Sequence, residues 1–333
     1  MPAIRPPIPI LPALRVLALT AALGALVLLG ARSGAAHGSS PAGPIESHHK
    51  VVFVQGISSE SACGATFVEL TANIRDFLLT APWVQSAVPL QPTDFRYFSY
   101  DPAPALPNRY CGGDLTQPDY TQKDTCWSVD NKYGTPTGPA ATIGSAQRLN
   151  DLIGWLIAQD PAVKIDVVAH SQGGVVAAFW LWRFAVPANV NSVVTLDSPV
   201  GGLPGLWYFV ADLKCRRLGV DPATEPWYDS ASDMRDGSAT NLAVQMAPAR
   251  APVFTMRTST SDVIVPDAAG AFDGAGCDSS ADMVATVCAG PNGPVVDFYA
   301  PLGNHVMLWR SPIPEELDLL GCAVIADLSP CIP

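Results

Sequence analysis

The segment Ile165 to Ala178, IDVVAHSQGGVVAA, constrains the fold of this chain more than any other stretch. It begins with a short apolar run rich in β-branched residues, which favours a buried strand. An apolar run of helical length follows, and Ser171 lies between the two. The pattern therefore predicts a strand, a sharp turn that carries Ser171, and a helix.

Strands and helices alternate along the rest of the chain. We expect strands at 50–55, 95–100, 192–196, 252–257 and 295–299, and helices at 66–80, 142–159, 239–246 and 314–328, besides the one after Ser171. The segments 101–139 and 267–294 have the composition of loops, and regular structure is not expected between 200 and 232. Such alternation builds a parallel sheet covered on both faces, with the carboxyl ends of its strands at one ligand-binding edge.

The turn itself resembles a known motif. The window Ala169-His170-Ser171-Gln172-Gly173 is similar to the nucleophile elbow G-x-S-x-G, with alanine in place of the first glycine. The sequence Ser-Gln-Gly-Gly resembles secreted bacterial lipases and esterases of the α/β-hydrolase superfamily. The resemblance implies an α/β-hydrolase fold, with a mostly parallel central sheet, helices on both faces and a small cap or lid insertion. The aromatic stretch 200–232 is either that lid or a helix packed into the core.

A serine nucleophile needs a histidine base, and this chain has five histidines. His37 lies at the end of the N-terminal leader, His48 and His49 precede the first predicted strand, and the elbow geometry directs His170 away from Ser171. His305 remains. It follows the last predicted strand, as the hydrolase order of serine, acid and histidine requires, and its loop resembles the histidine loop of small bacterial lipases.

Two aspartates compete for the third place in the triad. Asp262, in an Asp-x-x-Val-Pro context, resembles the acid turn of many α/β-hydrolases and is favoured over Asp197, which ends the strand after the elbow helix. The resemblance also implies an oxyanion hole from the backbone N–H groups of Ile57 and Gln172. Related lipases usually have His-Gly before the first of these donors, whereas this chain has Gln55-Gly56.

These residues predict a serine hydrolase that cleaves carboxylic esters, with lipids or other hydrophobic esters as substrates, and that needs no cofactor and no metal. An extracellular acyltransferase with the same triad is one alternative. A non-catalytic hydrolase-fold protein that binds hydrophobic ligands is another. We expect a monomer that makes a transient contact with a lipid interface.

The N-terminal 36 residues have the pattern of a secretory signal peptide. Arg5 and Arg15 accompany a proline-rich lead, an apolar run covers 16–30, and small residues follow at 34–36. We therefore expect one secreted domain over 37–333, the alternative being a membrane anchor through 16–30. Without the leader the chain loses Arg5, Arg15 and Arg32 and no acid, so its formal charge changes from −11 to −14. Such an acidic chain is not expected to bind nucleic acid or an anionic membrane.

All eight cysteines fall in the exported part, where disulfides are the expected state. Eight cysteines allow 105 pairings. Pairing near neighbours gives Cys111–Cys126, Cys277–Cys288 and Cys322–Cys331, and leaves Cys63 with Cys215.

Overall fold

The computed structural model describes residues 48–56, 71–98, 111–112, 144–217, 230–258, 265, 270, 272, 286–290, 293–300, 312 and 314–327. All of them lie within the unit Glu46–Pro333, and the predicted leader lies outside them. None of the helices in these ranges is both long and apolar enough to cross a membrane.

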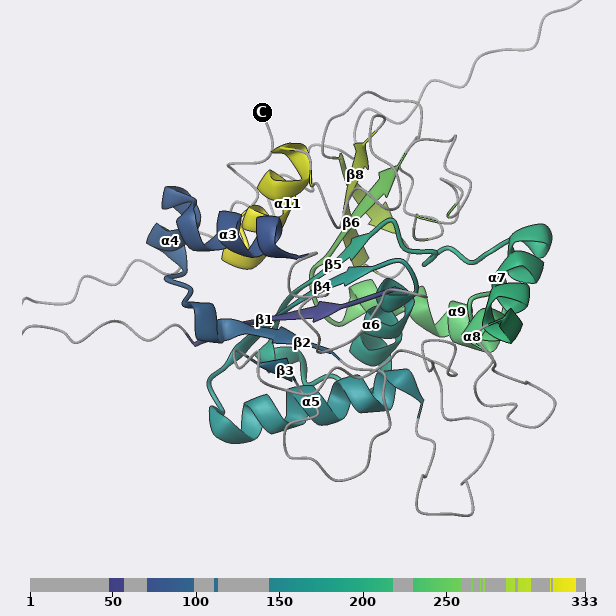
Figure 1. Cartoon of the computed structure of the whole chain (residues 1–333), viewed down its shortest axis with the longest axis horizontal. Helices are drawn as coiled ribbons and strands as arrows, with labels where there is room; N and C mark the ends of the chain where they lie inside the picture. Colours follow the sequence, from purple (N-terminus) through teal and green to yellow (C-terminus); the bar gives the residue numbers. More distant parts are fainter. Residues whose placement is uncertain are drawn as a thin grey trace, which may run out of the picture. The chain divides into compact units, whose positions relative to one another are not determined.

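The centre of the fold is an eight-stranded sheet (Figure 1). Its strand order is β3-β2-β1-β4-β5-β6-β8-β7, and the six strands from β2 to β8 in this order are parallel to one another. The outer strands β3 and β7 run antiparallel to their neighbours. The strands are β1 (His49–Val54), β2 (Phe95–Tyr97), β3 (Cys111–Gly112), β4 (Lys164–His170), β5 (Val190–Leu196), β6 (Val253–Thr258), β7 (Thr286–Gly290) and β8 (Gly293–Ala300).

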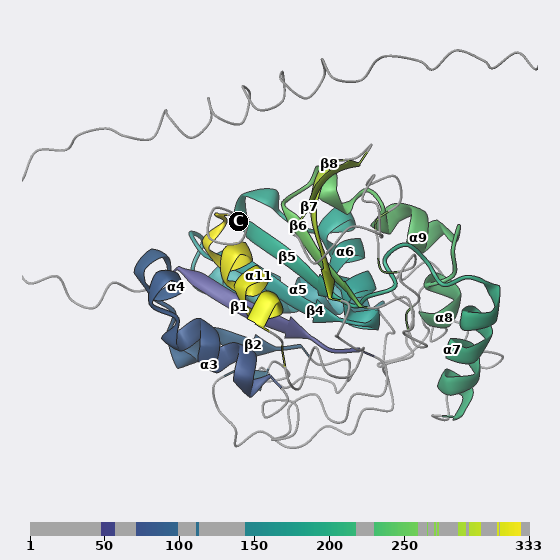
Figure 2. The same cartoon turned by 90° about the horizontal axis from the view of Figure 1, so that it is seen from above.

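Helices cover both faces of this sheet, as the alternation of elements predicted (Figure 2). In β1 the side chains of Val52 and Val54 point to one face and those of Val51 and Phe53 to the other, and all four are fully buried. One face packs against α5 (Ser145–Gln159) and α6 (Gln172–Arg183). The other packs against α3 (Ala72–Thr80), α4 (Pro82–Ala87) and α11 (Pro314–Ile325).

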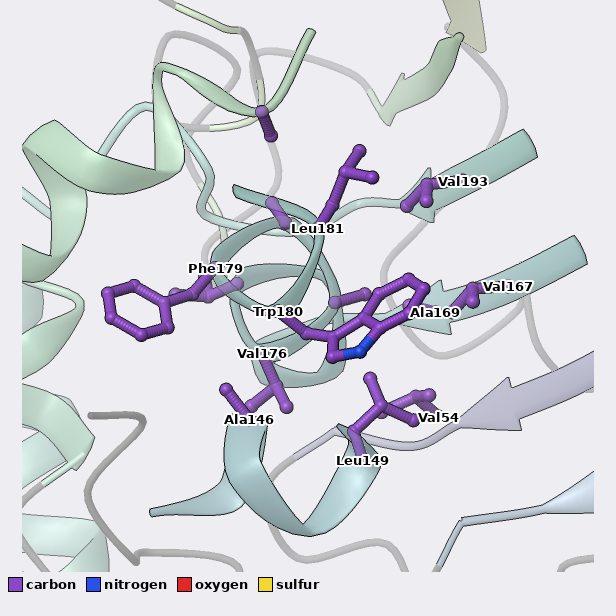
Figure 3. Close-up of a cluster of buried hydrophobic side chains, with 14 of the residues drawn as sticks. Val54, Ala146, Leu149, Val167, Ala169, Val176, Phe179, Trp180, Leu181 and Val193 are labelled. Atoms are coloured by element: carbon purple, nitrogen blue, oxygen red, sulfur yellow. The ribbon is translucent and has the colours of Figure 1, made fainter. Parts of the chain in front are cut away.

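The core beneath the elbow is centred on Trp180 of α6, whose side chain is completely buried. Figure 3 shows its indole ring among Ala169 and Val167 of β4 and Leu149 of α5. Burial of a large aromatic side chain of this kind contributes about 2 to 3 kcal/mol. The helix that follows Ser171 is therefore held firmly against the strand that precedes it.

Four segments differ from the sequence expectation. The strand β3 lies inside the segment 101–139 that was expected to be a loop. A second helix, α4, begins at Pro82, where proline was expected only to end the preceding helix. The strand β7 lies inside the segment 267–294 that was expected to be a loop. The expectation that 200–232 lacks regular structure is wrong, because α7 (Gly205–Arg217) and α8 (Ser230–Asp233) form there. The helix α9 (Ala239–Val244) is confirmed.

Candidate active site

Ser171 occupies the strand-to-helix turn that the sequence predicts. It lies between the last residue of β4 and the first residue of α6, with φ 56° and ψ −131°. A residue with a side chain adopts this region only at a cost of about 1 to 3 kcal/mol, so the surrounding structure must hold it there. The Ser171 N–H donates to the Leu196 carbonyl at 3.0 Å, and its own carbonyl accepts from the Gly174 N–H at 3.0 Å.

Close packing around this turn depends on three glycines. A Cβ atom at Gly56 would lie 2.5 Å from the Ser171 Cβ and 3.0 Å from its Oγ. At Gly173 it would lie 2.6 Å from the Gln55 carbonyl oxygen, and at Gly174 it would overlap the Ser198 side chain. The chain after β1 therefore passes directly beside the Ser171 hydroxyl.

The alanine at the first position of the motif is accommodated without strain. Ala169 is an ordinary residue of β4 with negative φ, and its methyl group is buried in the core on the α6 side. A glycine is required only where the backbone is left-handed or where another chain segment approaches closely. Neither condition holds at position 169, so the departure from G-x-S-x-G leaves the turn intact.

One expected oxyanion donor lies in the described structure. Gln172 is the first residue of α6, so its backbone N–H is among the groups that have no acceptor within the helix, and the helix dipole adds positive potential there. Its side chain is 1% exposed, and neither amide atom has a hydrogen-bond partner among the residues that the structure describes. Ile57 lies outside the described residues, but Gly56, which precedes it, contacts Ser171.

Of the three remaining triad candidates, only Asp197 lies within the described residues. Asp262 and His305 lie outside the described residues. Asp197 follows β5, is 1% exposed, and has a positive φ of 43°. Its N–H donates to the Met256 carbonyl of β6 at 2.7 Å. Both aspartates therefore stay candidates for the acid.

The register of the strands shows that the segments carrying Asp262 and His305 follow strands that end at the same edge of the sheet. His170 pairs with Leu196, Leu196 with Met256, and Thr258 with Ala300, so β4, β5, β6 and β8 end together. Asp262 comes four residues after β6 and His305 five residues after β8. The segments that carry both residues thus leave the sheet at the edge where Ser171 lies.

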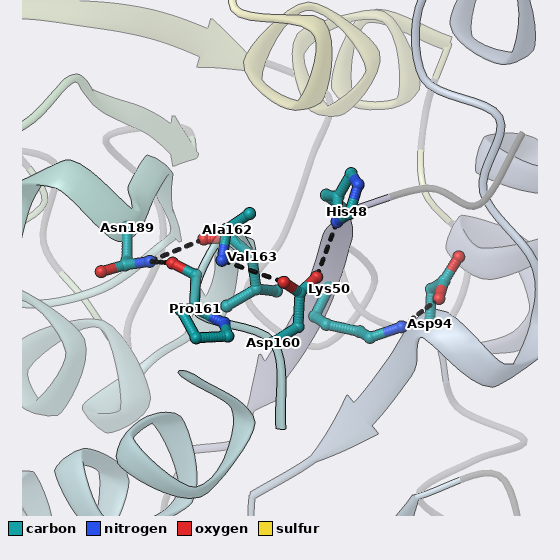
Figure 4. A network of polar contacts seen from close by, with 8 residues as sticks. All are labelled: His48, Lys50, Asp94, Asp160, Pro161, Ala162, Val163 and Asn189. Atoms are coloured by element: carbon teal, nitrogen blue, oxygen red, sulfur yellow. Dashed lines mark hydrogen bonds and ion pairs between the residues drawn. The ribbon is translucent and has the colours of Figure 1, made fainter. Parts of the chain in front are cut away.

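Two of the other histidines are at the opposite edge of the sheet. The His48 Nδ1 lies 2.7 Å from the Asp160 Oδ2, in a network of polar contacts that also includes Lys50 and the buried Asp94 (Figure 4). His49, which was expected just before the first strand, is instead the first residue of β1. A seven-residue strand is about 23 Å long, so neither imidazole reaches the carboxyl edge.

His49 belongs to a buried polar cluster at that amino edge. Its Nδ1 is 3.0 Å from the Asp166 Oδ2, while Asn191 and Ser192 donate to the Asp166 Oδ1 at 2.6 and 2.8 Å. Burial raises the pKa of Asp166, and these hydrogen bonds oppose the rise. The exposed Asp160 has the opposite shift, because the hydrogen bond with His48 lowers its pKa. Asn191 also donates to the Val324 carbonyl of α11 at 2.8 Å.

Sequence reasoning missed the contact of Gly56 with Ser171, because Gly56 was considered only as the end of the first strand and as the residue before the oxyanion donor Ile57. The signal was present, because a glycine at the carboxyl end of a buried strand often marks a close approach of another segment. The described residues contain no group of three or more His, Cys, Asp or Glu side chains that could hold a metal ion.

No protein-family model and no curated protein matches this chain. Solved structures similar to it include an esterase of Pyrococcus furiosus, with 13% identity and a TM-score of 0.46, covering 85% of this chain and 83% of that one. Naproxen esterase from Bacillus subtilis has 12% identity and a TM-score of 0.40, with coverage of 91% and 96%.

Phospholipase PlaB from Legionella pneumophila has 14% identity and a TM-score of 0.38 over 63% of this chain, which spans only 39% of that phospholipase. Structural similarities this weak do not indicate an activity for this chain. The fold class follows from the chain's own strand order, its two covered faces and the left-handed Ser171 between β4 and α6. The chain has an α/β-hydrolase fold.

Proposed function

We propose that this chain is a serine hydrolase that cleaves carboxylic esters through an acyl-enzyme on Ser171. The observation that carries the proposal is the backbone of Ser171, with φ 56° and ψ −131° on a turn built by close-packed glycines. An ordinary helix-capping serine has a β-region backbone and hydrogen-bonds the first turn of its helix, and Ser171 does neither. A strained polar residue at the ligand-binding edge of a parallel sheet is typical of a catalytic position.

In the proposed reaction the His305 imidazole takes the proton of the Ser171 hydroxyl as its oxygen attacks the ester carbonyl. The backbone N–H groups of Gln172 and Ile57 stabilise the oxyanion, and Asp262 stabilises the imidazolium. The imidazolium then protonates the departing alcohol. Water, activated by the same imidazole, attacks the acyl carbonyl, and the carboxylic acid leaves as Ser171 regains its proton.

The first experiment tests the nucleophile alone. A fluorophosphonate probe should label the wild-type protein at Ser171, as mapped by mass spectrometry, and should not label Ser171→Ala. Labelling at another serine, or ester hydrolysis retained by Ser171→Ala, would remove the assignment. Folding of the variant is checked by its thermal unfolding.

A second variant tests the geometry without touching the serine. Gly56→Ala would place a methyl group 2.5 Å from the Ser171 Cβ and 3.2 Å from the His170 carbonyl oxygen, so the serine must move. A misplacement of about 1 Å reduces catalysis by roughly 100-fold, and we expect a loss of that size in the labelling rate. Gly154→Ala, where an added Cβ meets nothing within 4 Å, is the matched control and should label normally.

We further propose that the substrates are hydrophobic esters and that the chain acts outside the cell after its leader is removed. The apolar leader and the aromatic segment after β5 support these two points. Rates across p-nitrophenyl esters of increasing chain length should rise from the acetate to longer acyl groups. Addition of an acceptor alcohol separates hydrolysis from acyl transfer, because a transferase would form a new ester instead of the acid.

A further inference from the structure

The outward face of α7 is apolar, in contrast to an ordinary surface helix. Leu206, Phe209, Val210 and Leu213 are 74, 59, 47 and 38% exposed. Their spacing of three, four and seven residues places them in one line along the helix, which we call the α7 stripe. Polar residues normally occupy the solvent face of a helix, so the pattern of α7 is reversed.

The opposite face of α7 is attached to the protein. Trp207 packs against the core cluster on the α6 side, and the Arg235 guanidinium lies 5.7 Å from the centre of the Tyr208 ring. Backbone hydrogen bonds tie Leu203, just before α7, to Met234 at 2.7 Å and to Asp236 at 3.1 Å. The face of α7 that carries Trp207 and Tyr208 therefore attaches the helix to the protein, and the α7 stripe on the other face stays exposed to solvent.

The stripe also lies at the edge of the sheet that carries Ser171. The helix begins nine residues after Leu196, the last residue of β5. Figures 1 and 2 both show α7 on the side toward which the arrows of β1, β4 and β5 point. A surface on which this stripe docked would lie on the side of the sheet that carries the candidate active site.

Charge at the end of α7 indicates the kind of surface. The helix ends with Lys214, Cys215, Arg216 and Arg217. Three of the 19 lysine and arginine residues of the chain are therefore in this last turn, although the chain as a whole has a formal charge of −11. With Asp212 as its one acidic residue, the helix carries a charge of three minus one, or +2.

The area of the stripe favours lipid over a second copy of the chain. A helix of 13 residues is about 20 Å long, and a stripe about 10 Å wide offers roughly 200 Å². A stable protein interface takes about 800 Å² from each partner. A lipid surface needs no such area, because an amphipathic helix inserts a few apolar side chains while basic residues meet the headgroups.

We propose that the α7 stripe docks on the surface of anionic lipid aggregates. Its apolar side chains enter the acyl region, and its basic last turn meets the headgroup phosphates. Delivery of ester substrate to Ser171 by this docking rests on the proposed function, whereas the docking itself does not.

The test uses the full chain carrying Ser171→Ala, so that vesicle lipids are not consumed. Vesicles of phosphatidylglycerol or phosphatidylcholine contain a trace of the same lipid with a diazirine in its acyl chain, and peptides crosslinked on irradiation are mapped. We expect crosslinks within 205–213, at least about tenfold more abundant with phosphatidylglycerol. Because the readout is local, lipid contact through the apolar leader does not interfere.

Three variants in the same background complete the design. Phe209→Ser with Leu213→Ser should lower the crosslink yield at Leu206 by about tenfold or more, because two inserting side chains are lost. Lys214→Gln with Arg216→Gln and Arg217→Gln should abolish the preference for phosphatidylglycerol. Val186→Ser, 53% exposed just before β5 at the far edge of the sheet, should change nothing.

The proposal is overturned if crosslinks fall only outside 205–217 or if the stripe variant crosslinks as the parent does. Equal yields with both lipids would overturn its anionic selectivity. A dimer in light scattering that the stripe variant dissociates would assign the stripe to a second copy instead. Fluorophosphonate labelling of the wild-type chain, done without vesicles, tests the proposed function separately. Thermal unfolding confirms that each variant folds, and Leu206→Ser alone provides a milder second variant.

Discussion

Gly173→Ala tests the packing that holds the elbow. A methyl group at this position would lie 2.6 Å from the Gln55 carbonyl oxygen and closer still to that of Val54. Val54 is the last residue of β1, which is fixed by pairing with β2 and β4, and Gln55 follows it directly. The helix α6 must therefore move away from the sheet by about 1 Å to restore an ordinary contact. Such a movement also loosens the packing of Trp180, which is fully buried on the same helix.

Overpacking of this kind costs about 1 to 3 kcal/mol, and we expect the upper half of that range because backbone atoms are opposed. In a domain of this size the midpoint of thermal unfolding should fall by roughly 4 to 10 °C. Gly154→Ala in α5, with open space around the new methyl group, should instead stabilise the protein by about 0.5 to 1 kcal/mol. Circular dichroism melting of both variants measures the contrast. A Gly173→Ala protein as stable as the wild type would refute the proposed packing.

Three more predictions concern stability. Gly174→Ala should destabilise the protein by about 1 to 3 kcal/mol, because the added methyl group would overlap the Ser198 side chain. In the double variant, Ser198→Gly should recover part of that loss, as measured by urea unfolding. Losses that simply add would contradict the contact. Burial raises the pKa of Asp166 above 3.8, so its contribution to stability is complete below pH 3.8 and is lost as pH rises through the folded-state pKa. Asp166→Asn removes this dependence of stability on pH. The unfolding free energy of the variant, relative to that of the wild type, should therefore increase with pH. A difference between the two proteins that does not change with pH would contradict the raised pKa of Asp166. Cys322 is disulfide-bonded, and reduction should cost about 2 to 4 kcal/mol, whereas an unchanged melting curve under reductant would show that the bond does not stabilise the fold.

The central strands were predictable because local and tertiary preferences agree there. The runs around Val51, Val168 and Val194 are β-branched and are buried on both faces, as parallel strands must be. The turn at Ser171 could likewise be predicted, because a buried strand, a polar residue and two glycines in succession leave few other structures open.

The missed elements are those whose pattern depends on a distant partner or on a special position. The strand β7 is half of a hairpin with β8, and its turn signal, Gly290-Pro291-Asn292-Gly293, lies within a glycine-rich segment. The helix α7 shows helical spacing, but its apolar side faces solvent, so the usual criterion of one buried stripe fails. The helix α4 begins with the proline that was expected only to stop α3.

Of the predicted site, the structure describes Ser171, Gln172 and the alternative acid Asp197. Asp262, His305 and Ile57 stay predictions, and so do the disulfide pairings, because the described residues include Cys322 but not Cys331. His48 and His49 were eliminated because they precede the first predicted strand, and the parallel pairing of β1 with β4 places both at the amino edge, away from Ser171.

The helix α11 covers residues of β4, β5 and β6 from the far end of the chain, and its carbonyls accept from Asn191. The part of this face that α11 covers therefore stays open on a nascent chain until the residues of α11 have left the ribosome. The packing of that face must therefore be completed after the rest of the sheet has been synthesised. A truncation that removes α11 should yield aggregates and no partly active enzyme.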